Sequence, residues 1–141
     1  MHNIVKLADA TRVYDVASVT PLSRAHQLSK RLENNVYLKR EDELSIHTFK
    51  LRGAYQKISS LTAEQAAKGV IASSAGNHAQ GVALSATKLG IKSIIVMPLS
   101  TPKIKVNSVE QLGGQVVLHG DVYDDAYQYA KQLEQQQDLI F

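Results

Sequence analysis

The sequence has 141 residues, of which 44% are hydrophobic and 21% are charged, and its formal net charge is +3. These values are ordinary for a globular domain and give no indication of a nucleic-acid partner. The absence of cysteine excludes disulfides and thiolate metal sites and favours a reducing, cytoplasmic setting. The histidines lack metal-ligand spacing and no apolar run approaches the roughly 20 residues of a membrane span, so we expect neither a metal nor a membrane contact.

The first half of the chain predicts two helices and two strands in alternation. Thr20 as a capping residue, followed by a proline in the first helical position, predicts a helix over residues 21–33. A short strand is expected over residues 36–39, and helical periodicity follows over residues 49–61. Residues 70–73 are a short apolar run, as expected for a strand buried in a parallel sheet.

The second half continues the alternation with three helices and two strands. The helices are predicted over residues 77–89, from Pro102 to the glycines at 113 and 114, and over residues 121–137; the strands are predicted over residues 93–97 and 115–118. Alternating strands and helices with short links indicate the α/β class. We therefore expect an open, mostly parallel twisted sheet with helices on both faces.

A lysine stands in the first turn of the predicted helix over residues 49–61. Its surrounding run is His47-Thr48-Phe49-Lys50-Leu51-Arg52-Gly53-Ala54-Tyr55. A lysine on a helix is more often a solvated charge than a nucleophile. Here Phe49 and Leu51 flank Lys50, and Gly53-Ala54 leaves room for close backbone approach, so the run predicts that the amine lies at a dry cleft. An amine in such a cleft can form a Schiff base with a carbonyl cofactor.

A second run of small residues lies where the strand over residues 70–73 turns into the next helix. Its sequence is Ser73-Ser74-Ala75-Gly76-Asn77-His78-Ala79-Gln80-Gly81. Backbone N–H groups at a helix start, together with one amide side chain, can bind an anionic ligand. The run and Lys50 together predict pyridoxal-phosphate chemistry. Asn77 is also a good helix-capping residue, and this alternative remains open.

Other loop chemistries do not fit this run. A P-loop needs a lysine and a hydroxyl residue where Val82-Ala83 stands. A dinucleotide site needs an acidic residue after the next strand, which here ends in Met97-Pro98. Ser74 and His78 lack the Gly-x-Ser-x-Gly elbow of a serine hydrolase.

These runs resemble the threonine dehydratases (threonine ammonia-lyases), which are pyridoxal-phosphate enzymes of fold type II, the tryptophan synthase beta family. The resemblance extends from about Thr20 to the end of the chain, and it rests on Lys39-Arg40-Glu41-Asp42, the run around Lys50, Ser74 to Gly81, Ile94 to Pro98, Lys103 to Val106 and Val117 to Gly120. The Lys-Arg-Glu-Asp stretch is similar to that of the biosynthetic, isoleucine-pathway type. Thr48 stands where the family more often has serine, a change that keeps the hydroxyl.

The resemblance implies a role for each residue of the two runs. Lys50 would carry pyridoxal 5'-phosphate and later move the alpha proton of the substrate. Asn77 would hydrogen-bond the ring hydroxyl oxygen of the cofactor, and Phe49 would lie close to the ring. The substrate carboxylate would be bound by the turn Ser74, Ala75, Gly76, Asn77 and His78.

The resemblance also implies an activity, the conversion of L-threonine to 2-oxobutanoate and ammonia, which is the first step of isoleucine biosynthesis. An amino acid would be the substrate, and the full-length enzyme would be a homo-oligomer. Two alternatives remain: a serine/threonine dehydratase or serine racemase of the same fold, and a catalytically inert binding domain.

The end of the sequence suggests that part of the enzyme is missing. Residues 138–141 predict the entry to another buried strand, and the only double glycine, Gly113-Gly114, is better explained as a helix stop than as a phosphate-binding loop. We therefore expect an incomplete α/β fold that is catalytically silent alone. Residues 1–50 would belong to an incomplete larger domain, and residues 51–141 to a smaller domain that is truncated near its end.

Overall fold

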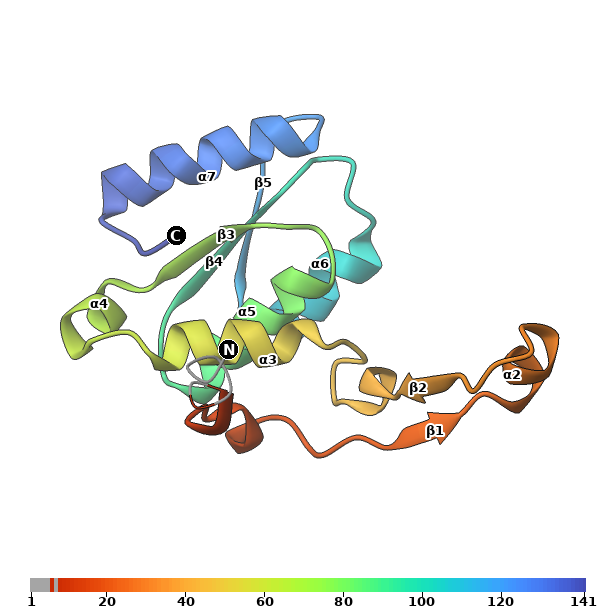
Figure 1. Ribbon diagram of the computed structural model, residues 1–141. Coiled ribbons are helices and arrows are strands. Elements are labelled where there is room, and N and C mark those ends of the chain that lie inside the picture. Colours follow the sequence, from red (N-terminus) through yellow and green to blue (C-terminus); the bar gives the residue numbers. More distant parts are fainter. Residues whose placement is uncertain (1–5, 7) are drawn as a thin grey trace.

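The computed structural model describes residues 6 and 8–141 and is built around a parallel sheet. The sheet has three strands in the order β3 (Val70–Ser73), β4 (Ser93–Met97) and β5 (Gln115–Leu118) (Figure 1). Val70 is opposite Ser93, and Ile94 is opposite Gln115. Every residue of β3 and β4 is buried, which explains why these strands are continuous apolar runs. The predicted α/β class and the three strand ranges are confirmed.

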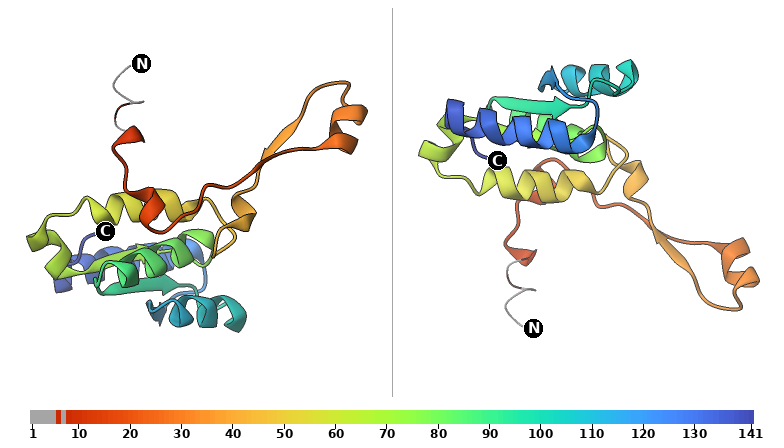
Figure 2. Two further views of the ribbon diagram at one scale, coloured as in Figure 1. Left: turned by 90° about the horizontal axis from the view of Figure 1, so that it is seen from below. Right: turned by 90° about the horizontal axis from the view of Figure 1, so that it is seen from above.

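Helices cover both faces of this sheet (Figures 1 and 2). The helices α3 (Lys50–Ser59), α5 (Asn77–Lys88) and α6 (Lys103–Gln111) contribute to one hydrophobic cluster, and α7 (Tyr123–Gln137) contributes to another. The first cluster contains Ala54, Val82, Ile95 and Val109, and the second contains Ile71, Val96, Ala126 and Ala130. Alternate residues of the strands thus face opposite layers, as the pleat of a sheet requires.

The residues after α7 return to the free edge of β3. Ile140 forms a parallel bridge with Val70, in which the Ile140 N–H donates to the Gly69 carbonyl at 3.0 Å and the Ile71 N–H donates to the Ile140 carbonyl at 2.9 Å. The pairing agrees with the prediction that residues 138–141 enter a strand. It also brings Phe141 to the edge of β3, opposite α3.

Residues 21–40 form an arm that projects from this body (Figures 1 and 2). Strand β1 (Leu22–Arg24) pairs antiparallel with β2 (Tyr37–Lys39), and α2 (His26–Arg31) lies at the tip between them. Two short 3-10 helices flank the arm, η1 (Val13–Asp15) before it and η2 (Glu41–Glu43) after it. The arm therefore leads directly into the segment that precedes Lys50.

The helix predicted over residues 21–33 is wrong for its first half. Residues Leu22–Arg24 are a strand, because the Arg40 N–H donates to the Pro21 carbonyl and the Ala25 N–H donates to the Val36 carbonyl across the ribbon. Thr20 does not cap a helix, since its hydroxyl donates to Glu41. Strand pairing with a distant segment therefore outweighs the local helix-start signal.

A short helix between α3 and β3 was not predicted. Helix α4 (Ala63–Lys68) begins at a reciprocal capping box, in which the Gln65 N–H donates to the Thr62 hydroxyl at 3.2 Å and the Thr62 N–H donates to the Gln65 side chain at 3.0 Å. The spacing of these two residues was a usable signal. Gly69 ends the helix with a φ of 84°, a conformation that favours glycine.

Candidate active site

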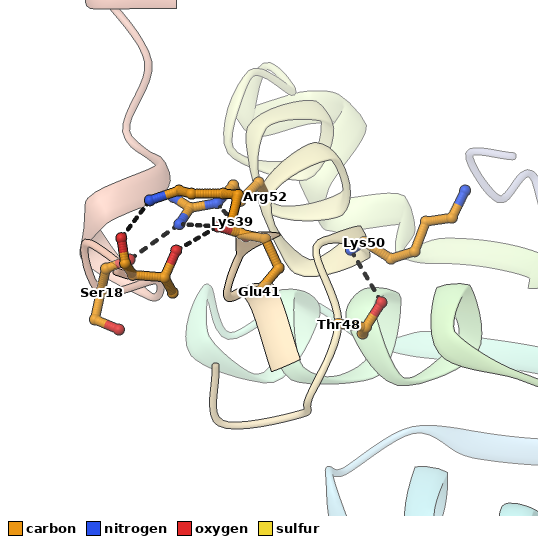
Figure 3. A network of polar contacts seen from close by, with 7 residues as sticks. Ser18, Lys39, Glu41, Thr48, Lys50 and Arg52 are labelled. Atoms are coloured by element: carbon orange, nitrogen blue, oxygen red, sulfur yellow. Dashed lines mark hydrogen bonds and ion pairs between the residues drawn. The ribbon is translucent and has the colours of Figure 1, made fainter. Parts of the chain in front are cut away.

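Lys50 is the first residue of α3, and a hydrogen bond and a buried neighbour fix the backbone of this turn. The Lys50 N–H donates to the Thr48 hydroxyl at 3.3 Å. Leu51 is fully buried and packs with Ala17, Leu44 and Ile46 in a separate hydrophobic cluster. The Lys50 side chain is exposed and extends away from the side where Arg52 lies (Figure 3). The run around Lys50 thus pairs an anchored backbone with a free amine.

The amine belongs to a cleft of about 470 Å³ between α3, β3, α5 and the end of the chain. Its walls are mostly apolar, and they are formed by Gly53, Ala54, Ile58, Leu61, Val70, Ile71, Ala72, Val82, Ile140 and Phe141, together with Phe49, Lys50, Lys57 and His78. Among the residues that the structure describes, no Asp or Glu side chain lines the cleft. Its charge therefore favours an anionic ligand, and its size suits a small molecule. The predicted cleft exists, but Lys50 stands in water at its rim rather than in a dry interior.

An aromatic ring and an imidazole accompany the amine. The Lys50 Nζ lies 5.2 Å from the centroid of the Phe49 ring, within the range of a cation–π contact. The Phe49 ring is 60% exposed, so one side of it is available to a ligand. Partial burial, and then the positive charge of Lys50, lower the pKa of His78. The His78 ring is therefore biased toward its neutral form, which can both donate and accept a hydrogen bond.

The turn that follows β3 has the shape of an anion site, although it does not line this cleft. Ser74 and Gly76 are half-buried, and the Gly76 N–H donates to the Ser74 hydroxyl at 3.4 Å. The Ala75 side chain packs against the hydrophobic core, so only the backbone of Ala75 is available to a ligand. The first N–H groups of α5 have no acceptor within the helix.

Asn77 does not cap α5. Gly76 occupies the N-cap position, and Asn77 is the first helical residue with an exposed side chain. Within residues 6 and 8–141, the Asn77 amide group has no hydrogen-bond partner. The cap interpretation of Asn77 is therefore wrong for this structure, and the amide is free to meet a ligand.

Of the predicted site residues, Lys50, Phe49 and His78 line the cleft. The other predicted residues do not line the cleft but directly precede His78 in the sequence; they are Ser74, Ala75, Gly76 and Asn77. They lie at the carboxyl end of β3, where ligands bind in open α/β sheets. Lys57, seven residues after Lys50 in α3, is a cleft residue that the sequence analysis missed. Helical spacing was the available signal, because residues two turns apart share a face.

The space beside Gly53 shows that the cleft has room for a flat cofactor. Gly53 lines the cleft one turn after Lys50, and a Cβ atom built on it would meet no atom within 4 Å. Bare backbone, an amine, an exposed aromatic ring and two further basic groups thus surround open space. This donor set fits a planar aldehyde that carries negative charge, as pyridoxal phosphate does. Among the described residues, no cluster of three metal-ligating side chains is present.

Comparison with known proteins defines the class. Residues 13–141 match the family model described as "Pyridoxal-phosphate dependent enzyme", and the chain belongs to this family. The resemblance to threonine dehydratases is likewise confirmed. A biosynthetic L-threonine dehydratase of Haemophilus influenzae is 56% identical over 138 residues, which cover 98% of this chain and 26% of that protein. A biosynthetic threonine dehydratase of Arabidopsis thaliana is 57% identical over 132 residues, which cover 94% of this chain and 22% of that protein.

Solved structures agree with this assignment. The processed form of threonine deaminase isoform 2 from Solanum lycopersicum is 50% identical, with a TM-score of 0.89 over 93% of this chain and 36% of that chain. Maize serine racemase has a TM-score of 0.90 over 98% of this chain and 42% of that chain, at 29% identity. The chain spans about a quarter of the length of the curated relatives that it matches.

Proposed function

We propose that this sequence carries the cofactor lysine of a threonine dehydratase that converts L-threonine to 2-oxobutanoate and ammonia. The observation that carries the proposal is the position of Lys50, whose amine lies beside the exposed Phe49 ring at the mouth of a cleft without acidic side chains. The 56% identity to a biosynthetic L-threonine dehydratase supports the choice of substrate. The word biosynthetic in the names of these relatives supports a place at the start of isoleucine synthesis.

The proposed reaction divides between the cofactor and Lys50. Pyridoxal phosphate supplies an electron-withdrawing ring that makes the alpha proton of a bound amino acid acidic. The Lys50 Nζ would hold the cofactor, and as a free amine it would take the alpha proton of the substrate. Loss of the beta hydroxyl as water, followed by addition of water and release of ammonia, balances the overall reaction.

The other residues position ligands rather than exchange protons. Phe49 offers its exposed face to a planar ring, and the free amide of Asn77 offers a donor to a ring oxygen. The Ser74 N–H donates to the Val96 carbonyl and the Gly76 N–H to the Ser74 hydroxyl, so the backbone N–H groups of Ala75, Asn77 and His78 are the donors left for the substrate carboxylate, which the start of α5 also favours electrostatically. His78 lies in the same cleft as Lys50, and its neutral ring can donate a hydrogen bond to a ligand there or accept one.

Trapping with borohydride tests this assignment directly. The chain is incubated with pyridoxal phosphate, reduced, digested and mapped by mass spectrometry. We expect Lys50 to be modified in preference to Lys57, which lines the same cleft but lacks the adjacent Phe49 ring. Equal labelling of the two lysines would contradict a special role for Lys50.

A serine racemase is the second candidate, because maize serine racemase matches 98% of the chain. Its 29% identity is well below the values for threonine dehydratases, which favours the dehydratase. Assays of the enzyme that carries this sequence with L-threonine and L-serine distinguish the two by oxoacid release against D-serine formation. A labelled Lys50 with neither product would favour a binding domain without catalysis.

We also propose that residues 1–50 and 51–141 belong to two different domains. The β1–β2 ribbon pairs with no strand of the sheet formed by β3 to β5, and its side chains are mostly exposed, which supports the division. Limited proteolysis should then cut within the exposed arm of residues 21–40 before it cuts within the sheet.

A cytoplasmic location and a homo-oligomeric state complete the proposal. The absence of cysteine supports a reducing compartment. In the described part of the chain, no helix is both long and apolar enough to cross a membrane. Cell fractionation and size-exclusion chromatography with light scattering test the two statements separately.

A further inference from the structure

One ion pair near Lys50 differs from the others in how well it is enclosed. The Arg52 Nε donates to Glu41 Oε2 at 2.7 Å, and the Arg52 Nη2 donates to Glu41 Oε1 at 3.1 Å, so the pair is bidentate. The side chains are 23% and 16% exposed, whereas each other ion pair in the described chain has at least one side chain more than a third exposed. Bidentate, enclosed pairs have a defined geometry that exposed pairs lack.

The pair is the centre of a network that joins three segments (Figure 3). The buried Thr20 donates its hydroxyl to Glu41 Oε1 at 2.6 Å, and Lys39 donates to the Thr20 carbonyl. Arg52 also donates to the Ser18 carbonyl at 3.0 Å. The hydrogen bond from Arg52, and then that from Thr20, lower the pKa of Glu41, so the carboxylate is charged at neutral pH. Both ends of the arm are thereby tied to the first turn of α3.

The geometry of helix α3 couples the position of Arg52 to that of Lys50. Residues two apart in a helix project about 200° from each other, so the side chains of Lys50 and Arg52 leave α3 on nearly opposite sides, as Figure 3 shows. Leu51 is fully buried between them. Once Arg52 is held on one side, the first turn cannot rotate, and the amine on the other side keeps its direction toward the cleft.

We propose that Glu41 is a positioning residue that acts through Arg52 to aim the Lys50 amine into the cleft. The inference rests on the proposed role of Lys50 and adds a second requirement to it: the arm must be docked for the lysine to be presented. Glu41 and Arg52 touch neither the cleft nor any reacting atom, since neither residue lines it. Their effect on the cleft is therefore exerted through the position of Lys50.

The test compares two isosteric or charge-conserving variants with a neighbouring control. Glu41→Gln keeps the shape and removes the charge, and Arg52→Lys keeps the charge and removes the bidentate contact. The control is Asp42→Asn, which removes an exposed ion pair with Arg40 in the same segment; among the described residues, the Asp42 side chain forms no hydrogen bond or ion pair with α3. Melting temperatures establish that each variant is folded.

The first measurement is the ratio of Lys50 to Lys57 modified by pyridoxal phosphate and borohydride in the 141-residue chain. We expect the ratio to fall by about fivefold in Glu41→Gln and in Arg52→Lys, and to stay unchanged in Asp42→Asn. The double variant should lose no more than either single variant, because the two residues act as one unit. Labelling is done well below the melting temperature of every variant, because an unfolded fraction would by itself bring the ratio towards one.

The second measurement is hydrogen exchange of the amides at residues 50–53. It should be faster in Glu41→Gln than in Asp42→Asn, whereas residues 54–59 of the same helix should be little affected. If the unmodified chain shows no preference for Lys50, the proposed function fails, and the exchange data still decide the role of Glu41. A folded Glu41→Gln chain with an unchanged ratio and unchanged exchange would overturn the inference.

Discussion

Gly81 of α5 lies against the backbone of Lys50: a Cβ atom placed on Gly81 would be 3.2 Å from the Lys50 carbonyl oxygen and 3.3 Å from its carbonyl carbon. The same atom would be 3.4 Å from the Ala54 Cβ. Helices α3 and α5 can therefore pack closely because residue 81 has no side chain. This contact holds the Lys50 turn on the α5 side, while Leu51 and Arg52 hold it on the others.

Replacement of Gly81 by alanine should displace the Lys50 turn. Alanine favours a helix over glycine by about 1 kcal/mol, but the crowding against Lys50 opposes this gain. Gly53→Ala is the matched comparison, because its Cβ would meet no atom within 4 Å. We expect Gly53→Ala to raise the melting temperature and Gly81→Ala not to raise it. An equal rise in both would show that the α3–α5 contact is loose.

If Lys50 has the proposed role, Lys50→Ala should abolish 2-oxobutanoate release from L-threonine in the enzyme that carries this sequence, because cofactor attachment and proton transfer would be lost together. Lys88→Ala serves as the control, since Lys88 is an exposed lysine of α5 that does not line the cleft. Its turnover should stay within a few-fold of the unmodified enzyme. Substantial oxoacid release by Lys50→Ala at saturating threonine would exclude the assigned role.

Asn77→Ala should affect cofactor binding more than folding. A hydrogen bond to a charged partner is worth about 1.5–3 kcal/mol, so the affinity for pyridoxal phosphate should fall by roughly 10- to 100-fold. The melting temperature without cofactor should be unchanged, because Gly76 and not Asn77 stands at the N-cap of α5. Fluorescence titration and thermal denaturation measure the two effects. A lowered melting temperature with unchanged affinity would support a structural role alone.

The pKa of His78 gives stability a defined pH dependence. Its folded-state pKa is below the ordinary value because of partial burial and the charge of Lys50, so the unfolded chain binds a proton more readily. The stability contributed by neutral His78 is complete above the unfolded pKa of about 6.5 and is lost as pH falls toward the lower folded pKa.

An NMR titration of the His78 ring tests this statement. Lys50→Ala should raise the pKa of His78 toward its ordinary value without restoring it fully, because burial is the larger cause. His78→Gln should remove the corresponding pH dependence of the free energy of unfolding. A His78 pKa that does not respond to Lys50→Ala would mean that the two groups are electrostatically independent.

The sequence alone was sufficient for the central sheet. The strands at residues 70–73, 93–97 and 115–118 match the prediction, because short apolar runs between helix stops and helix starts are local signals. The same locality explains why Lys50 was correctly placed in the first turn of a helix and why the turn from Ser74 to His78 was found before another helix.

The tertiary structure decided what these local signals could not. Residues 22–24 are a strand because they pair with residues 37–39, and Thr20 donates to Glu41, 21 residues away, instead of capping a helix. Distant segments likewise determine three features of the site: the partner of Arg52, the closeness of Gly81 to Lys50, and the exposure of Lys50 at the cleft rim. A residue's type and its neighbours in sequence set the local conformation. The direction of the Lys50 side chain is set by packing and hydrogen bonds that form only when the arm, α3 and α5 come together.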